Sequence, residues 1–317
     1  MAVLAGDQLG AIGVATAWRG LVRRDGGLAL EARPLREPGS GEALVRVELT
    51  GVCRTDLHAA RGRVPVANGR VLGHEFVGTI ESLGNPGAWA VGQRVVARPI
   101  LGCGACSTCR AGLDLCCAQG EHLGLGLDGS FAERCFLPTS LLVPVPAALP
   151  AEVAACVEPV AAALAVLDAG LPPGGEGVVL GQGRIAELTL RVLQAAGHRV
   201  RLLPPSALAP ASVDFAVETG GDAACLAAAV QGVRAGGTVV LKSRPQAPVA
   251  FDLHLAVRRQ LTLRAVGWGD FAMAVAWLAS GRLSLAGLLG PVYALADWPR
   301  GLARAEADEA VKVFLRP

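Results

Sequence analysis

Residues 178–186 read Val-Val-Leu-Gly-Gln-Gly-Arg-Ile-Ala, and they set the architecture of the second half of the chain. Three apolar residues predict a buried strand, two glycines predict a tight turn, and a helix is expected from Arg184. Gly181 permits the turn, Gly183 lets a phosphate approach the backbone, and Ala186 takes the place of a third glycine. The stretch therefore predicts a strand, turn and helix whose N-terminus can receive the pyrophosphate of a dinucleotide.

The segments that follow continue this alternation of strands and helices. Strands are expected at residues 199–203, 213–217 and 237–241, and helices at residues 184–196 and 223–233. Such alternation predicts a doubly wound parallel sheet. Only nine residues separate Leu203 from Val213, whereas a helix and a strand need about 15 residues or more. One βα unit after residue 203 is therefore expected to be missing.

The first 150 residues show a different pattern of apolar and turn-forming residues. Short extended runs such as Glu42–Leu49 and Gly92–Ala97 lie between Gly and Pro residues, which favours a β-rich domain. An Ala-rich segment, Val153–Ala169, then predicts one long helix, and mixed strand and helix return from about Leu288. We expect a β-rich domain over residues 1–155 and 288–317, and the parallel-sheet domain over residues 156–287.

Composition excludes several classes of protein. With 317 residues and 52% hydrophobic residues, the chain can bury the cores of two domains. Lys and Arg number 29 and Asp and Glu 27, so the net charge of +2 argues against coating nucleic acid or anionic lipid. No apolar run reaches the roughly 18 residues of a membrane span. The apolar start, Met1–Ala17, lacks a basic leading segment and is expected to be a loose extension.

Four cysteines at short spacing form the strongest single motif. They follow the pattern C-x2-C-x2-C-x7-C inside a Gly-rich stretch, residues 101–118, and are Cys103, Cys106, Cys109 and Cys117. Four thiolates at such spacing predict a closed tetrahedral zinc site. Cys116 stands beside Cys117, so the identity of the fourth ligand is open by one residue. Clustered cysteines in a long chain favour a reducing compartment, and we expect a cytoplasmic protein.

A second candidate metal site draws on residues far apart in the sequence. Cys53 lies within Gly51–His58, and His74 follows about twenty residues later within Gly73–Gly78. A cysteine and a histidine at that spacing are weak evidence by themselves. Several other short motifs strengthen the case, namely Gly73-His-Glu75, the four-cysteine stretch, Asp128–Glu133, Glu158-Pro159 and the Gly181-x-Gly183 turn.

Together these motifs resemble the zinc-dependent medium-chain dehydrogenase/reductase family, the group of alcohol and sorbitol dehydrogenases. The resemblance covers about Trp18 to Pro317. It implies a GroES-like β-rich catalytic domain with a zinc-binding lobe, beside a Rossmann-type cofactor domain, here with a shortened sheet. It also implies two zinc ions per chain, one structural and one catalytic, and a nicotinamide cofactor.

The resemblance assigns roles to residues of the second site. Cys53, His74 and the carboxylate of Glu158 would surround the catalytic zinc. Glu75 matches another carboxylate at the metal, and which glutamate is the direct ligand stays open. Three protein ligands with one open position are what a catalytic zinc requires. Asp56 matches the residue that orients the ring of the zinc-bound histidine.

Three residues near Cys53 gain roles by the same resemblance. Arg54 matches a position that can meet a cofactor phosphate. Thr55 and His58 match a proton relay that runs from the substrate oxygen through the hydroxyl and the cofactor ribose to a surface imidazole. Histidine ordinarily titrates near pH 6.5, which suits such a relay. A helix-capping Thr and a solvated His are the structural alternatives.

The end of the second predicted strand bears on cofactor choice. A site that prefers NAD has an acidic residue there, which binds the ribose hydroxyls. Residues 203–206 instead read Leu-Pro-Pro-Ser. Arg199, Arg201 and Ser206 lie close in sequence, so NADP is expected to bind at least as readily as NAD. The missing βα unit would flank the adenosine half, and weak binding is therefore expected.

Three hypotheses about function remain from the sequence. The first is a zinc-dependent oxidoreductase that interconverts an alcohol and a carbonyl compound with NADP or NAD. The second is a non-redox zinc enzyme, such as a lyase, hydratase or isomerase, with weakened dinucleotide binding. The third is a zinc-stabilised binding protein, which the retained Thr55 and His58 disfavour. We expect a small-molecule substrate, no nucleic-acid or membrane partner, and a homodimer or homotetramer. Candidate pocket residues are Trp89, Trp268 and Phe271.

Overall fold

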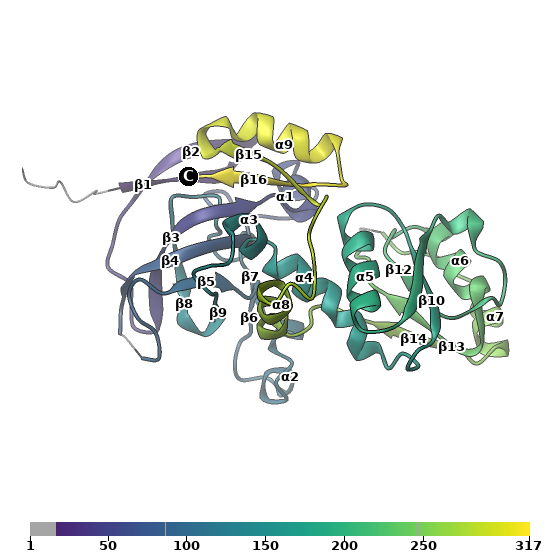
Figure 1. Cartoon of the computed structure of the whole chain (residues 1–317). Helices are drawn as coiled ribbons and strands as arrows, with labels where there is room; N and C mark the ends of the chain where they lie inside the picture. The colour runs from purple at the N-terminus through teal and green to yellow at the C-terminus, as the bar shows by residue number, and fades with distance from the viewer. Residues whose placement is uncertain (1–16, 86, 246) are drawn as a thin grey trace, which may run out of the picture.

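The computed structural model describes residues 17–317 except residues 86 and 246, so nearly all of the expected N-terminal extension lies outside the described residues. Figure 1 shows two lobes, with α4 (Val157–Leu164) and α8 (Phe271–Ala279) between them. No helix in the described ranges is both long and apolar enough to cross a bilayer.

One lobe is built on a five-stranded, all-parallel sheet with the order β11-β10-β12-β13-β14. Its strands are β10 (Glu176–Leu180), β11 (Arg199–Leu203), β12 (Val213–Glu218), β13 (Val233–Leu241) and β14 (Thr262–Ala265). Helix α5 (Arg184–Ala195) covers one face, whereas α6 (Ala223–Gly232) and α7 (Leu253–Arg258) cover the other. Helices on both faces bury alternate strand residues on opposite sides, as in doubly wound sheets.

The sheet is short at one edge. Between Leu203 and Val213 the chain forms only a 3-10 turn, Pro205–Ala207, and β11 is the edge strand. This arrangement is what the absence of one βα unit produces. The strand order reverses direction between β10 and β12, so the crevice that such sheets use for ligands lies at the carboxyl ends of these two strands.

The other lobe is β-rich and includes both ends of the described chain. Its main sheet has the order β15-β16-β3-β4-β5-β9, and β8 also pairs with β3. These strands are β3 (Glu42–Gly51), β4 (Glu75–Leu83), β5 (Arg94–Ala97), β8 (Arg134–Pro138), β9 (Leu142–Pro144), β15 (Leu289–Ala294) and β16 (Lys312–Arg316). Two further antiparallel pairs join β1 (Ala17–Arg24) to β2 (Gly27–Pro34), and β6 (Ile100–Leu101) to β7 (Glu121–His122). Helix α9 (Trp298–Ala307) leads back into this sheet.

The long helix expected over Val153–Ala169 was wrong as a single element. The segment is divided into α3 (Ala151–Ala154), α4 and a 3-10 turn, Ala165–Ala169. Pro159 explains the break, because its ring clashes with the carbonyl four residues earlier and excludes a continuous helix through Ala155. Because α3 ends before α4 starts, α4 forms a separate helix that lies between the two lobes.

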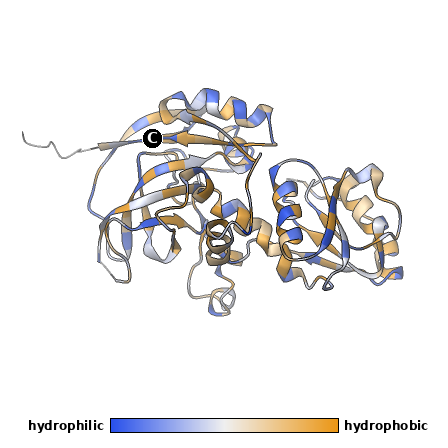
Figure 2. Cartoon of the chain, in the orientation of Figure 1, coloured by the Kyte–Doolittle hydropathy of each residue, from blue (hydrophilic) through white to orange (hydrophobic). Residues whose placement is uncertain are grey.

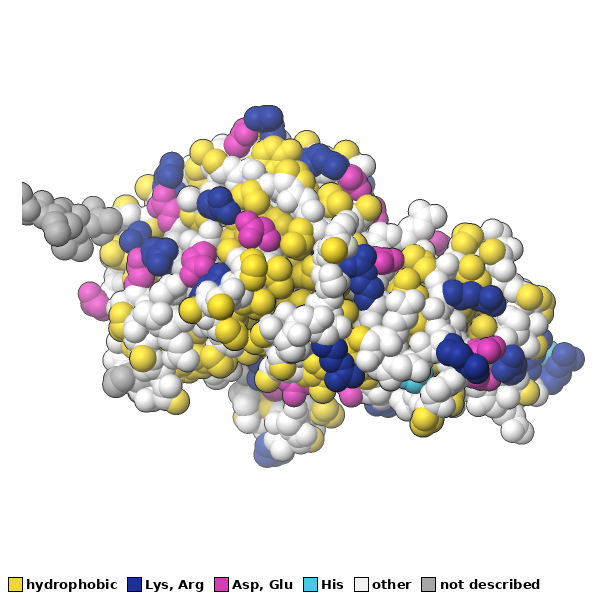
Figure 3. Space-filling model, viewed as in Figure 1, with side chains coloured by type: hydrophobic (Ala, Val, Ile, Leu, Met, Phe, Trp, Pro, Cys, Tyr) yellow, Lys and Arg dark blue, Asp and Glu magenta, His cyan; other side chains and the backbone are white. Residues whose placement is uncertain are grey.

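Packing around α4 holds the lobes together. One buried cluster contains Leu49 and Val77 of the β-rich sheet, Val160 and Ala161 of α4, and Phe215 of the parallel sheet. Figure 2 shows the hydrophobic residues gathered on α4 and α8 and mixed with hydrophilic ones on α5. In Figure 3, basic and acidic side chains are interspersed over the visible face, with no single-sign stripe there. The shared core therefore fixes the crevice of the parallel sheet against the β-rich lobe.

Candidate metal centre and cofactor cleft

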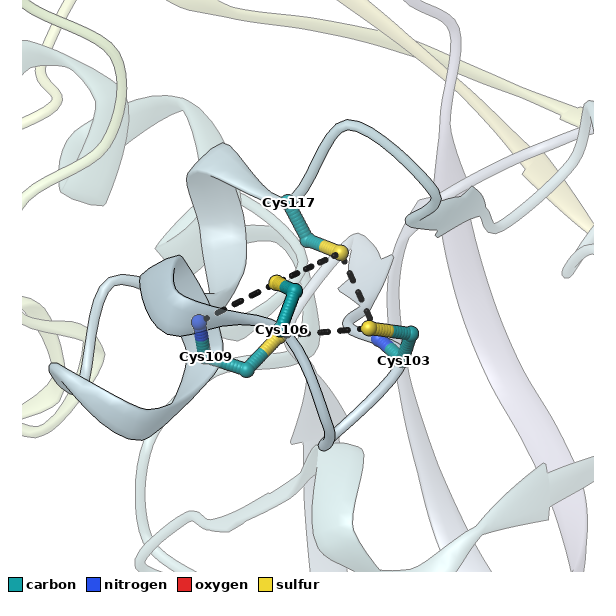
Figure 4. A group of neighbouring side chains, drawn as sticks. All are labelled: Cys103, Cys106, Cys109 and Cys117. Carbon is teal, nitrogen blue, oxygen red and sulfur yellow. Dashed lines mark hydrogen bonds between the residues drawn. The ribbon is translucent and has the colours of Figure 1, made fainter.

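The four cysteines of the C-x2-C-x2-C-x7-C motif point toward a common centre (Figure 4). They lie around the short helix α2 (Ser107–Arg110) and the 3-10 turn Asp114–Cys116, in the projection at the foot of the β-rich lobe (Figure 1). The sulfur atoms of Cys103 and Cys109 are 4.0 Å apart, and those of Cys106 and Cys117 are 3.8 Å apart. A tetrahedron of thiolates at about 2.3 Å from zinc has edges of about 3.8 Å, so the group fits zinc.

Local hydrogen bonds lower the pKa of two of these four thiols. The backbone N–H of Cys109 donates to the sulfur of Cys106 and lowers the pKa of that thiol to about 6. Backbone N–H groups likewise lower the pKa of Cys103. Thiolates are the form that binds zinc. Cys116 is exposed and outside the group of four, so the geometry favours Cys117 as the fourth ligand.

A second group consists of Cys53, His74 and Glu75, whose ligand atoms all lie within 4.8 Å of one another. Cys53 is the N-cap of α1 (Arg54–Ala60), whereas His74 and Glu75 stand where β4 begins. These two residues are buried, with 3% and 2% of their surfaces exposed. A thiol, an imidazole and a carboxylate form a donor set that suits zinc and leaves a coordination position open.

Asp56 ties the two ligand-bearing segments together. Its carboxylate accepts hydrogen bonds from the backbone N–H of Cys53, at 2.9 Å, and of Gly73, at 3.2 Å. One of its oxygens also lies 3.4 Å from Nδ1 of His74, which leaves the other ring nitrogen for a metal. Burial opposes a charge on this imidazole, but Asp56 and Cys53 outweigh it and raise the pKa of His74 well above its usual value. The pocket thus attracts a cation.

Lys312 is a site residue that the sequence reasoning missed. It begins β16, is only 4% exposed, and its ammonium group pairs with a carboxylate oxygen of Glu75. It also donates to the backbone oxygen of Val52 at 3.2 Å. The ion pair compensates the buried charge of Glu75 and fixes that carboxylate beside Cys53 and His74.

Glu158 is near the metal group but is not a member of it. The carboxylate of this α4 residue accepts a hydrogen bond from Nε1 of Trp268 at 2.5 Å, and burial raises its pKa. The geometry therefore favours Glu75 as the direct ligand. Of the three aromatic candidates for the pocket, Trp268 adjoins the site through its hydrogen bond to Glu158, whereas Trp89 packs against a core of the β-rich lobe and Phe271 is buried in the shared core.

The two relay candidates lie on α1. Thr55 and His58 are three residues apart, so they stand about one helical turn from each other, and both are half-buried. Cys53, not Thr55, occupies the N-cap position. Burial and the neighbouring charges of Arg54, Arg63 and Arg61 lower the pKa of His58 below 6.5, whereas Glu309 partly opposes that shift.

The glycine turn has the geometry that a dinucleotide site requires. Gly181 and Gly183 adopt φ values of 133° and 83°, which other residues rarely do. A Cβ on Gly181 would come within 2.2 Å of the hydroxyl oxygen of Thr219. The turn leads into the N-terminus of α5, and Ala186 is fully buried in its first turn. Backbone N–H groups are thus presented at the crevice between β10 and β12.

A segment of the β-rich lobe contacts this turn directly. The backbone oxygen of Glu309 accepts hydrogen bonds from the backbone N–H of Arg184, at 3.2 Å, and from its guanidinium group, at 3.1 Å. The carboxylate of Glu309 pairs with Arg54 at 2.5 Å. A Cβ on Gly183 would lie 3.4 Å from the Cβ of Glu309. The residue expected to meet a cofactor phosphate is therefore paired with an acidic side chain.

The structure does not support a role for Arg199 in binding the 2′-phosphate of NADP. Arg199 stands at the start of β11 and pairs with Glu176 at 3.3 Å. Ligands meet such sheets at the carboxyl ends of the strands, so Arg199 lies at the wrong end. Arg199 begins β11 whereas Ser206 follows its end, so the two residues lie at opposite edges of the sheet. The local sequence pattern does not show which edge a residue will occupy.

A cavity of about 110 Å³ joins the metal group to the cofactor turn. Cys53 and Glu75 line it on one side, and Arg184 and Ile185 of α5 line it on the other. Arg54 and Lys312 complete its polar lining. The two candidate sites therefore open into one space between the lobes.

Comparisons with known proteins agree with this architecture. Residues 39–147 match the alcohol dehydrogenase GroES-like domain family. An L-threonine 3-dehydrogenase from Xanthomonas campestris pv. campestris (strain B100) is 37% identical over 148 residues, which is 44% of this chain and 44% of the relative. The chain thus matches about half the length of such curated relatives.

Solved structures extend the likeness over both lobes. A protein from Sinorhizobium meliloti 1021 that was assigned as a zinc-binding dehydrogenase, bound to NADP, shows 26% identity and a TM-score of 0.88, covering 95% of this chain and 99% of its own. An alcohol dehydrogenase from Thermus sp. ATN1 shows 28% identity and a TM-score of 0.82, covering 94% and 99%. The expected GroES-like and Rossmann-type domains are confirmed, and these likenesses support the zinc-dependent medium-chain dehydrogenase/reductase family.

Proposed function

We propose that this chain is a zinc-dependent oxidoreductase that interconverts an alcohol and a carbonyl compound with a nicotinamide cofactor, NADP or NAD. The observation that carries the proposal is the shared cavity. It places Cys53 and Glu75 of the metal group opposite Arg184 and Ile185 at the N-terminus of α5. A substrate bound at the metal and a dinucleotide bound at the turn would meet in that space.

The zinc ions and the nicotinamide cofactor would each supply one kind of chemistry. Zinc held by Cys53, His74 and Glu75 would act as a Lewis acid, and a nicotinamide would donate or accept a hydride. The second zinc, held by the four cysteines, would stabilise the β-rich lobe. It would take no part in the reaction, because a closed site has no open coordination position. Asp56 holds the ligand segments in place, and Lys312 fixes the carboxylate of Glu75.

Dinucleotide binding would use the helix N-terminus and its neighbours. The positive-φ glycines and the N–H groups of the first turn of α5, except that of Arg184, which donates to Glu309, fit a pyrophosphate. Arg54 and Arg184 add positive charge beside them. The short sheet ends at β11, so the adenosine half would have less protein around it. No acid stands at residues 203–206 to repel a 2′-phosphate.

Proton transfer is proposed to involve Thr55 and His58. We expect Thr55→Ala to lower turnover by about 100-fold or more, a common contribution of general acid–base catalysis. His58→Gln should act more mildly and flatten the pH profile. In the unchanged protein, the rate of alcohol oxidation should rise with pH, because only neutral His58 can accept the proton. The midpoint of that rise should lie below pH 6.5, because the pKa of His58 is lowered. Steady-state kinetics at several pH values measures both effects.

Added imidazole should partly rescue His58→Gln and not Thr55→Ala. His198→Gln is a matched control, because His198 lies beside Phe215 in the other lobe. Unchanged turnover and pH dependence in both relay variants, with zinc still bound, would show that the relay is absent and weaken the oxidoreductase assignment.

Cofactor choice is the next expected result. Fluorescence titrations should show that NADPH binds at least as tightly as NADH, since the end of β11 lacks an acidic residue. Removing the charge of Glu309, which is paired with Arg54, should free that arginine for a phosphate. Glu309→Gln is therefore expected to tighten the binding of both dinucleotides several-fold, because a like charge close to the phosphates is lost.

Glu306→Gln provides the matched control. Glu306 pairs with Arg61 through a similar exposed ion pair that does not involve the glycine turn. A strong preference for NADH would contradict the specificity argument, and equal effects of the two variants would show that Glu309 has no special position.

The direct test of the proposed function is turnover. Zinc-loaded protein should oxidise alcohols with NADP⁺ or NAD⁺ and reduce the matching carbonyl compounds with NADPH or NADH, as followed at the absorbance of the reduced cofactor. The short sheet favours a second candidate, a non-redox zinc lyase, hydratase or isomerase. That candidate predicts conversion of substrate without consumption of dinucleotide.

The finer biological setting is also proposed. A homodimer or homotetramer is supported by β14, an edge strand whose outer side has no partner among the described residues. A cytoplasmic location is supported by the nine cysteines, none of which is paired in a disulfide.

A further inference from the structure

The chain is rich in arginine and nearly devoid of lysine. Among 29 basic residues, lysine stands only at positions 242 and 312. Both lysines are buried, with 7% and 4% of their surfaces exposed, and Lys312 lines the cavity between the lobes. Lys312 is paired with Glu75, whereas Lys242 has no carboxylate partner within the described ranges. Glu158 attracts the Lys242 ammonium without forming an ion pair with it, so the desolvation of this buried cation is offset only in part.

Lys242 follows β13, at the carboxyl edge of the parallel sheet. Its ammonium group donates one hydrogen bond, to the backbone oxygen of Gly267 at 2.7 Å, and leaves two N–H groups for other acceptors. Burial, together with the nearby charge of Arg244, lowers its pKa to about 8. Even so, it is mostly protonated at neutral pH.

Arg244 stands two residues further on and is exposed. Its guanidinium group lies 3.9 Å above the ring of Trp268. Stacking engages the flat face of the guanidinium and leaves its N–H edge free. Over the described part of the chain, Arg244 forms no hydrogen bond or ion pair. Two cations therefore lie side by side with unused donors.

Trp268 connects these cations to the metal group. Its Nε1 donates to Glu158, and its ring is 6.3 Å from that of His122. The His122 ring is in turn 5.0 Å from that of His74, the candidate zinc ligand. Arg244 is thus linked through Trp268 to the residues beside the metal group.

We propose that Arg244 and Lys242 bind a carboxylate of the substrate, so that the alcohol is a hydroxy acid and the carbonyl compound an oxo acid. The inference rests on the proposed function and adds the substrate class. A guanidinium edge binds a carboxylate through two parallel hydrogen bonds, and the neighbouring ammonium adds a second charge. The nearby carboxylate of Glu158 is held by Trp268. Phosphates of a dinucleotide have a separate place, at Arg54 and Arg184.

Kinetics on matched substrates tests the proposal. Zinc-loaded protein is assayed with 2-, 3- and 4-hydroxy acids and with their neutral primary amides. Wild type should prefer at least one of the acids. Arg244→Gln should lower kcat/KM for that acid by about 10- to 100-fold, the range expected for a charge-assisted pair, while changing kcat/KM for its amide little. Lys242→Met should act in the same direction, and Arg244→Lys should retain part of the preference.

Arg282→Gln is the matched control, because Arg282 also stacks on a tryptophan, 4.0 Å above Trp277 of α8, and lies away from Arg244. Equal losses for acid and amide in Arg244→Gln, or a wild-type preference for amides, would overturn the proposal. A similar weakening of NADPH binding in Arg244→Gln would assign the cations to the cofactor and also overturn it.

Binding of oxamate, an unreactive analogue of an oxo acid, gives a readout that does not depend on turnover. Calorimetry should detect oxamate binding to the wild type and a loss of about 10-fold or more in Arg244→Gln. No binding, or equal binding to both proteins, would contradict the carboxylate site even if neutral alcohols are oxidised. Arg244-dependent binding without any oxidation of alcohols would instead contradict the proposed function alone.

Discussion

Cys53→Ser is expected to reduce turnover by about 1,000-fold or more while leaving a folded protein with one zinc per chain in place of two. A bound Lewis acid contributes several kcal/mol to transition-state stabilisation, and each 1.4 kcal/mol is about a tenfold change in rate. Cys53 supplies the only thiol of the group with His74 and Glu75, and its backbone N–H already anchors Asp56. Metal analysis on desalted protein, together with steady-state kinetics, measures the result.

Cys225→Ser is the matched control for that substitution. Cys225 is buried in α6, and its thiol donates to the backbone oxygen of Leu180 at 3.4 Å, a bond that a serine hydroxyl can keep. Zinc content and turnover should stay at wild-type levels. Full zinc content in Cys53→Ser, with turnover lost, would show that Cys53 acts otherwise than as a ligand.

Cys106→Ala is expected to lower the stability of the protein much more than Cys53→Ser does. Structural zinc in small domains contributes about 10–16 kcal/mol of binding free energy, which is coupled to folding. Even partial loss of that energy should lower the melting temperature by roughly 10 °C or more. One zinc per chain should disappear, and the lobe over residues 101–118 should become sensitive to proteolysis. Thermal melts and metal analysis measure both effects.

Cys116→Ser separates this effect from the general loss of a thiol. Cys116 neighbours Cys117 in sequence but is exposed and lies outside the group of four. The variant should keep both zinc ions and an unchanged melting temperature. A zinc loss in Cys116→Ser equal to that in Cys106→Ala would mean that the fourth ligand is wrongly assigned.

The parallel-sheet domain could be predicted from sequence because its signals are local. Apolar runs separated by glycine turns placed β10, β11 and β12 within two residues of their observed bounds. Counting residues between Leu203 and Val213 was enough to predict a shortened sheet. Such spacing arguments succeed because a helix and a strand have minimum lengths that no tertiary contact can change.

Tertiary placement was the part that sequence could not supply. Lys312, Trp268 and Glu309 come from segments that meet the site only after the lobes pack together. Arg199 is near the strand end in sequence but lies at the opposite edge of the sheet. One overlooked signal was compositional: a chain that uses arginine almost everywhere has lysine at two positions, and both are buried.

Transfer of deuterium from a labelled cofactor tests the central claim most directly. Zinc-loaded protein would be mixed with NADPH carrying deuterium at the transferable position of C4 and with the carbonyl compound that it reduces. The product alcohol should gain one deuterium at the former carbonyl carbon, and Cys53→Ser should abolish the transfer. Conversion of substrate with no deuterium in the product and no loss of NADPH would contradict the account and assign the site to non-redox zinc chemistry.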